Sequence, residues 1–199
     1  MLSTLRNLNQ VILAEGNKHL NLNINSKKVD NYSQSKKVAL TGVMAALIAV
    51  TTIIAIPLPP PLSTINLAPI IIFAVSILLG PTVGVTSTAI GCTIGYLAGT
   101  SVGTIIVPPG FVYIYLIGLV VARSPMALAA GALRKKSEIS GMVLGVVIET
   151  LIFFAIDFAL FGIGFAVFDF ATLVDLIFVP VTFAVLIAVR RFLDTKYIA

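Results

Sequence analysis

The sequence is poor in the residues that most often build enzyme active sites and metal centres. It contains no tryptophan, one cysteine and one histidine. Because Cys92 stands alone, the chain cannot form an internal disulfide. The single histidine, His19, lies in a polar stretch, so the apolar part can hold no Ser-His-Asp triad, Cys-His pair or two-histidine metal site. We therefore expect a protein with no catalytic site, no metal and no cofactor.

Charged residues are also scarce, at 11% of 199 residues, whereas 58% are hydrophobic and the mean hydropathy is +1.08. A soluble domain is closer to half apolar and about a quarter charged. Six apolar runs lie at 37–56, 68–80, 82–100, 110–133, 139–162 and 172–191. About 20 mostly apolar residues form one helix across a bilayer. The sequence predicts an all-α integral membrane protein, with a polar cytoplasmic tail over 1–35 and six transmembrane helices over 36–199.

Basic residues are missing from alternate connections between these runs, namely 57–67, 101–109 and 163–171. Twelve of the thirteen basic residues fall on the other side of six crossings: Arg6, Lys18, Lys27, Lys28, Lys36, Lys37, Arg134, Lys135, Lys136, Arg190, Arg191 and Lys196. The positive-inside rule places that side, with both termini, in the cytoplasm and the protein in the cell membrane as a multi-pass protein. Topology thus explains the net charge of +5, and no basic face with interleaved aromatic residues indicates nucleic-acid binding.

Small residues are concentrated on two of the expected helices. The first run contains TGVMAALIAVTTIIAI (41–56), in which Gly42, Ala45, Ala46 and Ala49 fall three or four apart on one side of a helix. In the third run and just after it, glycines recur every four residues from position 91 to position 103, which favours close helix packing over a nucleotide site. The small residues of the first run fit either docking of a membrane partner or an internal helix interface.

Two charged residues of opposite sign fall near the centre of the predicted membrane domain. Arg123 is some 13 residues into the fourth run from outside, and Glu149 is some 11 residues into the fifth from inside. At about 1.5 Å per residue both reach the midplane, so an Arg123–Glu149 pair is feasible. Such charges are costly in a membrane. The pair either fixes the packing of the two helices or contacts a solute.

Polar and aromatic residues gather toward the outer side. Asp157, Asp169 and Asp175 are predicted at this level, with Asn66 in the first outer connection and Tyr113 at the start of the fourth run. Aromatic walls with a few polar groups are typical of small-molecule pockets. The other interpretation is an interfacial aromatic belt with solvated acids.

In size and topology the chain resembles the substrate-binding (S) components of energy-coupling factor (ECF) transporters over residues 36–195. Three further features carry the resemblance. The first run has the spacing of Ala45 and Ala49, the first outer connection leads into NLAPIIIFAVSILLGPTVGVTSTAIG (66–91), and a basic connection precedes the fifth run.

The resemblance implies a subunit that captures a vitamin or related small solute outside the cell. Delivery would require a membrane-embedded coupling (T) subunit driven by two ABC ATPases. Gly42, Ala45, Ala46 and Ala49 would then dock that subunit, and the solute would be held by Asn66, Tyr113, Asp157, Asp169 and Asp175. Their acidic bias suits a cationic or hydrogen-bond-donating solute.

Two other classes of function fit the residues. One is a solitary small-solute or ion carrier that works without ATPases, in which Arg123, Glu149 and Asp157 form a proton or ion path. The other is a membrane enzyme such as a lipid-head-group transferase. The enzyme is disfavoured because no carboxylates cluster at the short spacing that would hold a metal.

Overall fold

The computed structural model describes residues 33–57, 64–107 and 109–198. Its elements, in chain order, are α2 (Gln34–Ile53), β1 (Ala55–Pro57), β2 (Thr64–Asn66), α3 (Ala68–Leu79), α4 (Pro81–Val102), the 3₁₀ helix η1 (Pro109–Phe111), α5 (Val112–Leu133), α6 (Glu138–Phe161), α7 (Ile163–Ala166), the 3₁₀ helix η2 (Val167–Ile177) and α8 (Phe178–Ile198). The predicted tail over 1–35 lies outside the described residues except for its last three positions.

The described part of the chain is predominantly helical, as predicted, and four stretches are long and apolar enough to cross a membrane. They are α2, α5, α6 and the stretch Ile163–Phe192, which runs through α7, η2 and α8. Helix α4 has 22 residues, but its many glycines, threonines and serines make it less apolar. Helix α3 has only 12 residues, so it spans about 18 Å. A hydrocarbon core is about 30 Å thick.

Helix α3 lies inside the bundle, where a short helix needs no contact with lipid. Its residues Ile72 and Phe73 are fully buried and belong to a core that also includes Met126 of α5, Met142 of α6 and Leu186 of α8. Its neighbour α4 begins directly after Gly80, whose φ of 96° a residue with a side chain rarely adopts. Surrounding protein therefore covers α3, which explains how a sequence too short for a full span remains apolar throughout.

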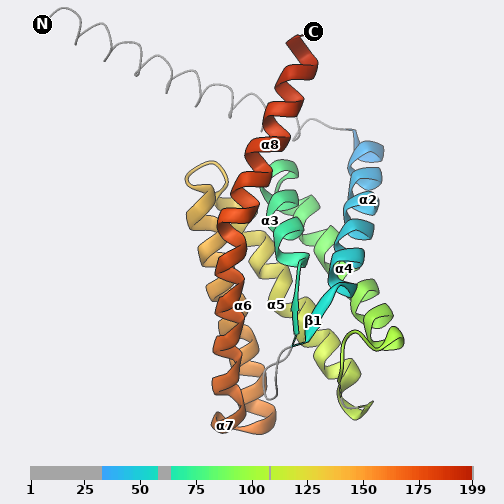
Figure 1. Ribbon diagram of the computed structural model, residues 1–199, viewed down its shortest axis with the longest axis vertical. Coiled ribbons are helices and arrows are strands. Elements are labelled where there is room, and N and C mark those ends of the chain that lie inside the picture. The colour runs from blue at the N-terminus through green and yellow to red at the C-terminus, as the bar shows by residue number, and fades with distance from the viewer. Residues whose placement is uncertain (1–32, 58–63, 108, 199) are drawn as a thin grey trace, which may run out of the picture.

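Basic side chains collect at one end of the bundle. In Figure 1, α2 begins and α8 ends at this end, while α7 lies at the opposite end. An ion pair joins α8 to α6 here, with Arg190 Nη1 3.1 Å from Glu138 Oε2. The connection between α5 and α6, with Lys135 and Lys136 exposed, lies at the same end.

Helices α2 and α4 approach each other closely through small residues. A Cβ atom on Gly91 would lie 2.6 Å from the Ala45 carbonyl oxygen, and one on Gly95 would lie 2.7 Å from that of Ala49. Only glycine permits this spacing, which is the small-residue packing of membrane helices. The predicted glycine ridge ends after Gly95, because Gly99 instead contacts Ile105 of the following connection.

Two segments differ from the structure expected for the outer connections. Strands β1 and β2 form an antiparallel hairpin in which Ile56 pairs with Ile65, whereas the sequence predicted an all-α protein without strands. The segment 163–171 is helical, and the expected final helix over 172–191 begins as an α-helix only at Phe178. Helix α6 ends at Phe161, and Gly162 with φ 82° turns the chain so that α7 and η2 pack back against α6.

Candidate functional site

A cavity of about 320 Å³ opens in the half of the bundle that lies away from the basic end. Helices α5, α6 and η2 supply most of its wall. The end of α2, strand β2, α4 with the connection after it, and α7 complete the wall. Ligand pockets commonly enclose roughly 300–1,000 Å³. The cavity therefore has the volume of a small-molecule site.

Two antiparallel helices present regular stripes of side chains to the cavity. The lining residues on each helix lie four apart, namely Tyr115, Leu119 and Arg123 on α5 and Glu149, Phe153 and Asp157 on α6. Residues four apart share one face of an α-helix. Because the helices run in opposite directions, Arg123 and Glu149 meet at the deep end of the cavity, while Tyr115 and Asp157 lie nearer the other end.

The 3₁₀ geometry of η2 produces a third stripe. Asp169, Thr172 and Asp175 lie three apart and line the cavity together, because a 3₁₀ helix has three residues per turn. The Thr172 hydroxyl donates to the Asp169 carbonyl oxygen at 2.7 Å and lies 2.7 Å from the hydroxyl of Thr150 on α6. These contacts hold the stripe of Asp169, Thr172 and Asp175 against α6.

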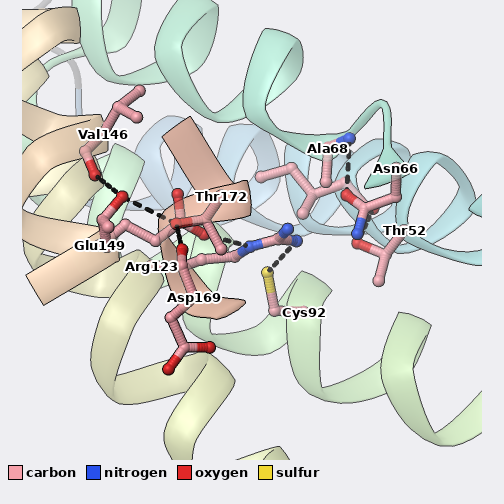
Figure 2. A network of polar contacts seen from close by, with 11 residues as sticks. Thr52, Asn66, Ala68, Cys92, Arg123, Val146, Glu149, Asp169 and Thr172 are labelled. Atoms are coloured by element: carbon pink, nitrogen blue, oxygen red, sulfur yellow. Dashed lines mark hydrogen bonds and ion pairs between the residues drawn. The ribbon is translucent and has the colours of Figure 1, made fainter. Parts of the chain in front are cut away.

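The inner end of the cavity holds a buried ion pair. Arg123 Nε donates to Glu149 Oε1 at 3.0 Å, and the two residues are 5% and 1% exposed. Figure 2 shows the Arg123 guanidinium between Glu149 and Cys92, whose Sγ lies 3.9 Å from Nη1. Asp175 is also buried and is near enough to interact electrostatically with both members of the pair.

A second pair of acidic residues lies toward the outer end. The carboxyl groups of Asp157 on α6 and Asp169 on η2 contact each other. Asp157 is 4% exposed, and its Oδ1 receives no hydrogen bond from the described residues. Two carboxyl groups in contact need a hydrogen-bond donor between or beside them, because paired negative charges repel strongly in a site of low dielectric constant.

Aromatic rings form the outer rim of the cavity. Tyr115 stacks on Phe161 with centroids 6.5 Å apart, and Phe161 in turn contacts Phe165 at 5.1 Å. Phe165 meets Phe168 edge to face at 6.5 Å. Tyr115, Phe165 and Phe168 line the cavity, so their rings offer a flat apolar surface to a solute.

Four of the five residues expected to hold a solute line this cavity: Asn66, Asp157, Asp169 and Asp175. Asn66 also has a local task, because its Oδ1 accepts a hydrogen bond from the backbone N–H of Ala68 at 3.2 Å and holds the start of α3 (Figure 2). Tyr113 lies elsewhere. It is 75% exposed, because a residue two positions before Tyr115 projects from a different face of α5.

The four small residues of α2 divide between two faces of the helix. Ala45 and Ala49 are buried against α4, at 2% and 6% exposure, and these two belong to an internal helix interface. Gly42 and Ala46 are exposed. A docking strip made of all four residues is therefore not available on the surface of the folded chain.

Several cavity residues carry no clear signal in the sequence. Thr52 at the end of α2, Phe153 on α6 and Thr172 on η2 are ordinary residues in apolar surroundings. Phe153 could have been predicted to line the cavity, because it lies four residues from both Glu149 and Asp157 and therefore on the same helix face. Predicting Thr172 would have required the three-residue period that a 3₁₀ helix gives between Asp169 and Asp175.

A comparison with known protein families identifies the kind of protein to which this cavity belongs. The family model described as ECF-type riboflavin transporter, S component, matches residues 33–190. None of the curated proteins compared with the chain matches it. The family is one of substrate-specific transporter subunits and not of enzymes, and S components in general work with a T component and ATPases. The chain belongs to the family of ECF-type riboflavin transporter S components.

Proposed function

We propose that this chain captures riboflavin, or a closely related aromatic vitamin, from outside the cell and holds it in the cavity between α5, α6 and η2. The observation that carries the proposal is the cavity itself, with aromatic rings at its rim and polar groups beyond them. Riboflavin has a flat ring system and a chain of hydroxyl groups. The rings of Tyr115, Phe165 and Phe168 would contact the ring system. The carboxyl groups on α6 and η2 would accept hydrogen bonds from the hydroxyl groups.

We further propose that the chain crosses the cell membrane six times, with both termini in the cytoplasm. Helices α2, α4, α5, α6 and α8 would be full crossings, and the short α3, enclosed by the other helices and preceded by strand β2, would be part of the sixth. The basic residues at the end where α2 begins and α8 ends support this orientation. The opposite connections contain no Lys or Arg. The cavity would then open to the outside.

For delivery, the chain would bind a membrane-embedded T subunit driven by two ABC ATPases. The exposed face of α2 supports a docking role for this helix, because Gly42 and Ala46 leave a smooth surface between exposed apolar side chains such as Val43 and Val50. In lipid, close packing of such surfaces drives helix association. Ala45 and Ala49 would act indirectly by setting the position of α2 on α4.

The direct test of the solute is a titration of riboflavin with the purified full chain in mild detergent, followed through the fluorescence of riboflavin. We expect saturable quenching at one site per chain, since a stacked aromatic side chain alters the emission of the bound ring. An absence of saturable binding, with the chain shown to be folded by its circular dichroism, would contradict the proposed solute.

A further inference from the structure

The outward surface of the second half of α6, of α7 and η2, and of the first half of α8 carries no polar side chain. In residues 151–189, all of which the structure describes, every exposed residue is apolar. The polar residues of this stretch are turned inward: Asp157, Asp169, Thr172 and Asp175 line the cavity, and Thr182 is fully buried. The apolar surface thus continues from α6 to α8 through the turn between them.

This turn, residues 158–170, is unlike a connection that lies in water. Its large side chains are 37–57% exposed, namely those of Phe158, Leu160, Phe161, Ile163, Phe165, Val167, Phe168 and Phe170. The connection at the opposite end of α6 instead exposes Lys135 and Lys136. A contiguous exposed apolar patch marks a surface that contacts a membrane or another protein.

The residue types of the turn favour lipid acyl chains over water and headgroups. Its aromatic residues are all phenylalanine, and residues 151–189 contain no tyrosine or tryptophan. Tyrosine and tryptophan, which have a polar tip, are the aromatic residues enriched where the membrane meets water. A phenylalanine ring has no such tip and gains most from a fully apolar environment.

The length of α6 places the turn at the outer boundary of the hydrocarbon core. Glu138 at the start of α6 pairs with Arg190 at the basic end, which marks the inner boundary. Helix α6 has 24 residues. At 1.5 Å per residue it is about 36 Å long, and at a common tilt of about 20° it covers about 34 Å of depth. The hydrocarbon core is about 30 Å thick.

We propose that α7 and residues 167–170 of η2 are embedded in the outer leaflet of the bilayer, with acyl chains packed against their exposed side chains. The segment 163–171 was expected as an outer connection, and it is then not exposed to water. Phe165 and Phe168 both line the cavity and reach the outward surface, so lipid borders this part of the cavity wall. Lipid is favoured over a protein partner because the surface is uncharged and continuous with the apolar faces of two membrane helices.

The chain contains no tryptophan, so a single introduced tryptophan reports its own surroundings. Ile163→Trp and Val167→Trp probe the turn at exposed positions that do not line the cavity. Lys135→Trp, exposed at the basic end, is the control in water. Leu151→Trp, exposed near the middle of α6, is the control in the hydrocarbon core. The full chain is placed in phosphatidylcholine nanodiscs, which leave both membrane faces open to dissolved iodide.

Lipids brominated in the upper part of the acyl chain quench tryptophan in the membrane, whereas iodide quenches tryptophan in water. We expect the brominated lipid to reduce the emission of both turn variants at least twofold. Iodide should quench both at least fivefold less strongly than Lys135→Trp. Quenching by iodide without quenching by the brominated lipid would overturn the inference. Protection from both quenchers would also overturn it, because protein and not lipid would then cover the surface.

Cysteine variants repeat the test with a smaller side chain, in case a tryptophan variant fails to fold. Cys92 is fully buried and should contribute little background. In nanodiscs, Ile163→Cys should react with a water-soluble maleimide at least tenfold more slowly than Gly110→Cys, although both positions are exposed in the folded chain. Equal rates would overturn the inference. Neither measurement uses riboflavin, so the proposed solute and the embedded turn can fail independently.

Discussion

At the scale of single residues, Arg123 and Glu149 show how a membrane protein accommodates charge. The pair lies in the interior with an Nε–Oε1 distance of 3.0 Å, and it joins α5 to α6. In the interior of a protein, each charge of such a pair compensates the other. Removing one residue therefore leaves an uncompensated buried charge.

We predict that Glu149→Gln lowers the free energy of unfolding by about 3 kcal/mol, because the Arg123 charge then remains buried without its counter-ion. Thermal unfolding in detergent measures the change. Glu138→Gln is the matched control, since its pair with Arg190 is more exposed and is worth about 1 kcal/mol or less. Equal effects of the two substitutions would contradict the distinction between the pairs.

A second prediction concerns the aromatic rim. Replacing Tyr115 by Ala removes a ring that lines the cavity and stacks on Phe161, so riboflavin should bind about tenfold more weakly. The fluorescence titration gives the dissociation constant. Tyr113→Ala changes the same residue type on the same helix outside the cavity, and it should bind riboflavin within twofold of the unaltered chain. If Tyr113→Ala had the larger effect, the cavity would not be the binding site.

The positions of several site residues follow from the sequence alone. Arg123 and Glu149 could be expected at one depth, because counting residues from opposite ends of two spans suffices for that. The contrast between Tyr113 and Tyr115 could not be predicted, since either tyrosine fits an outer aromatic belt. Which one faces the cavity depends on the rotation of α5, and contacts with the other helices set that rotation.

At the scale of elements, the arrangement depends on helices that approach closely and on short irregular segments. The long apolar helices α2, α5 and α6 were predictable because hydrophobicity alone defines them. The hairpin of β1 and β2 and the 3₁₀ helix η2 were not, because short segments derive their conformation from the surrounding contacts rather than from periodicity. Asp169, Thr172 and Asp175 lie three apart, so they lie directly above one another in the 3₁₀ conformation.

The division of the small residues on α2 gives a third prediction. Ala49→Trp should reduce the yield of folded protein and weaken riboflavin binding, because the ring would collide with α4 at Gly95. Ala46→Trp places the same side chain on the exposed face, so binding should persist while the complex with a T subunit is lost. Titration and co-purification of the T subunit separate the two effects. Loss of binding in both variants would contradict the division.

At the scale of the whole molecule, polarity is asymmetric along the bundle. Basic residues occupy the end where α2 begins and α8 ends, whereas acidic residues line the cavity toward the other end. The gathering of basic residues at one end could be predicted because it depends on counts of Lys and Arg between apolar runs, not on packing. The depth of the cavity could not, since it results from the way α7 and η2 return toward the bundle.

The proposed orientation predicts a pattern of labelling by a membrane-impermeant maleimide in intact cells. Cys92 is fully buried, so the unaltered chain should give little background. Gly110→Cys, at an exposed position with room for a side chain, should be labelled from outside. Lys135→Cys, exposed at the basic end, should be labelled only after the membrane is permeabilised. The reverse pattern would refute the proposed topology.

The central claim is that this chain acts as the solute-binding subunit of a larger transporter, and one measurement tests it most directly. The tagged full chain is purified from membranes of its native host in mild detergent, and the proteins that accompany it are identified by mass spectrometry. We predict a polytopic T subunit and two ABC ATPases, in amounts that fall when Ala46→Trp is introduced. Recovery of the chain alone in several detergents would contradict the claim and favour a solitary carrier.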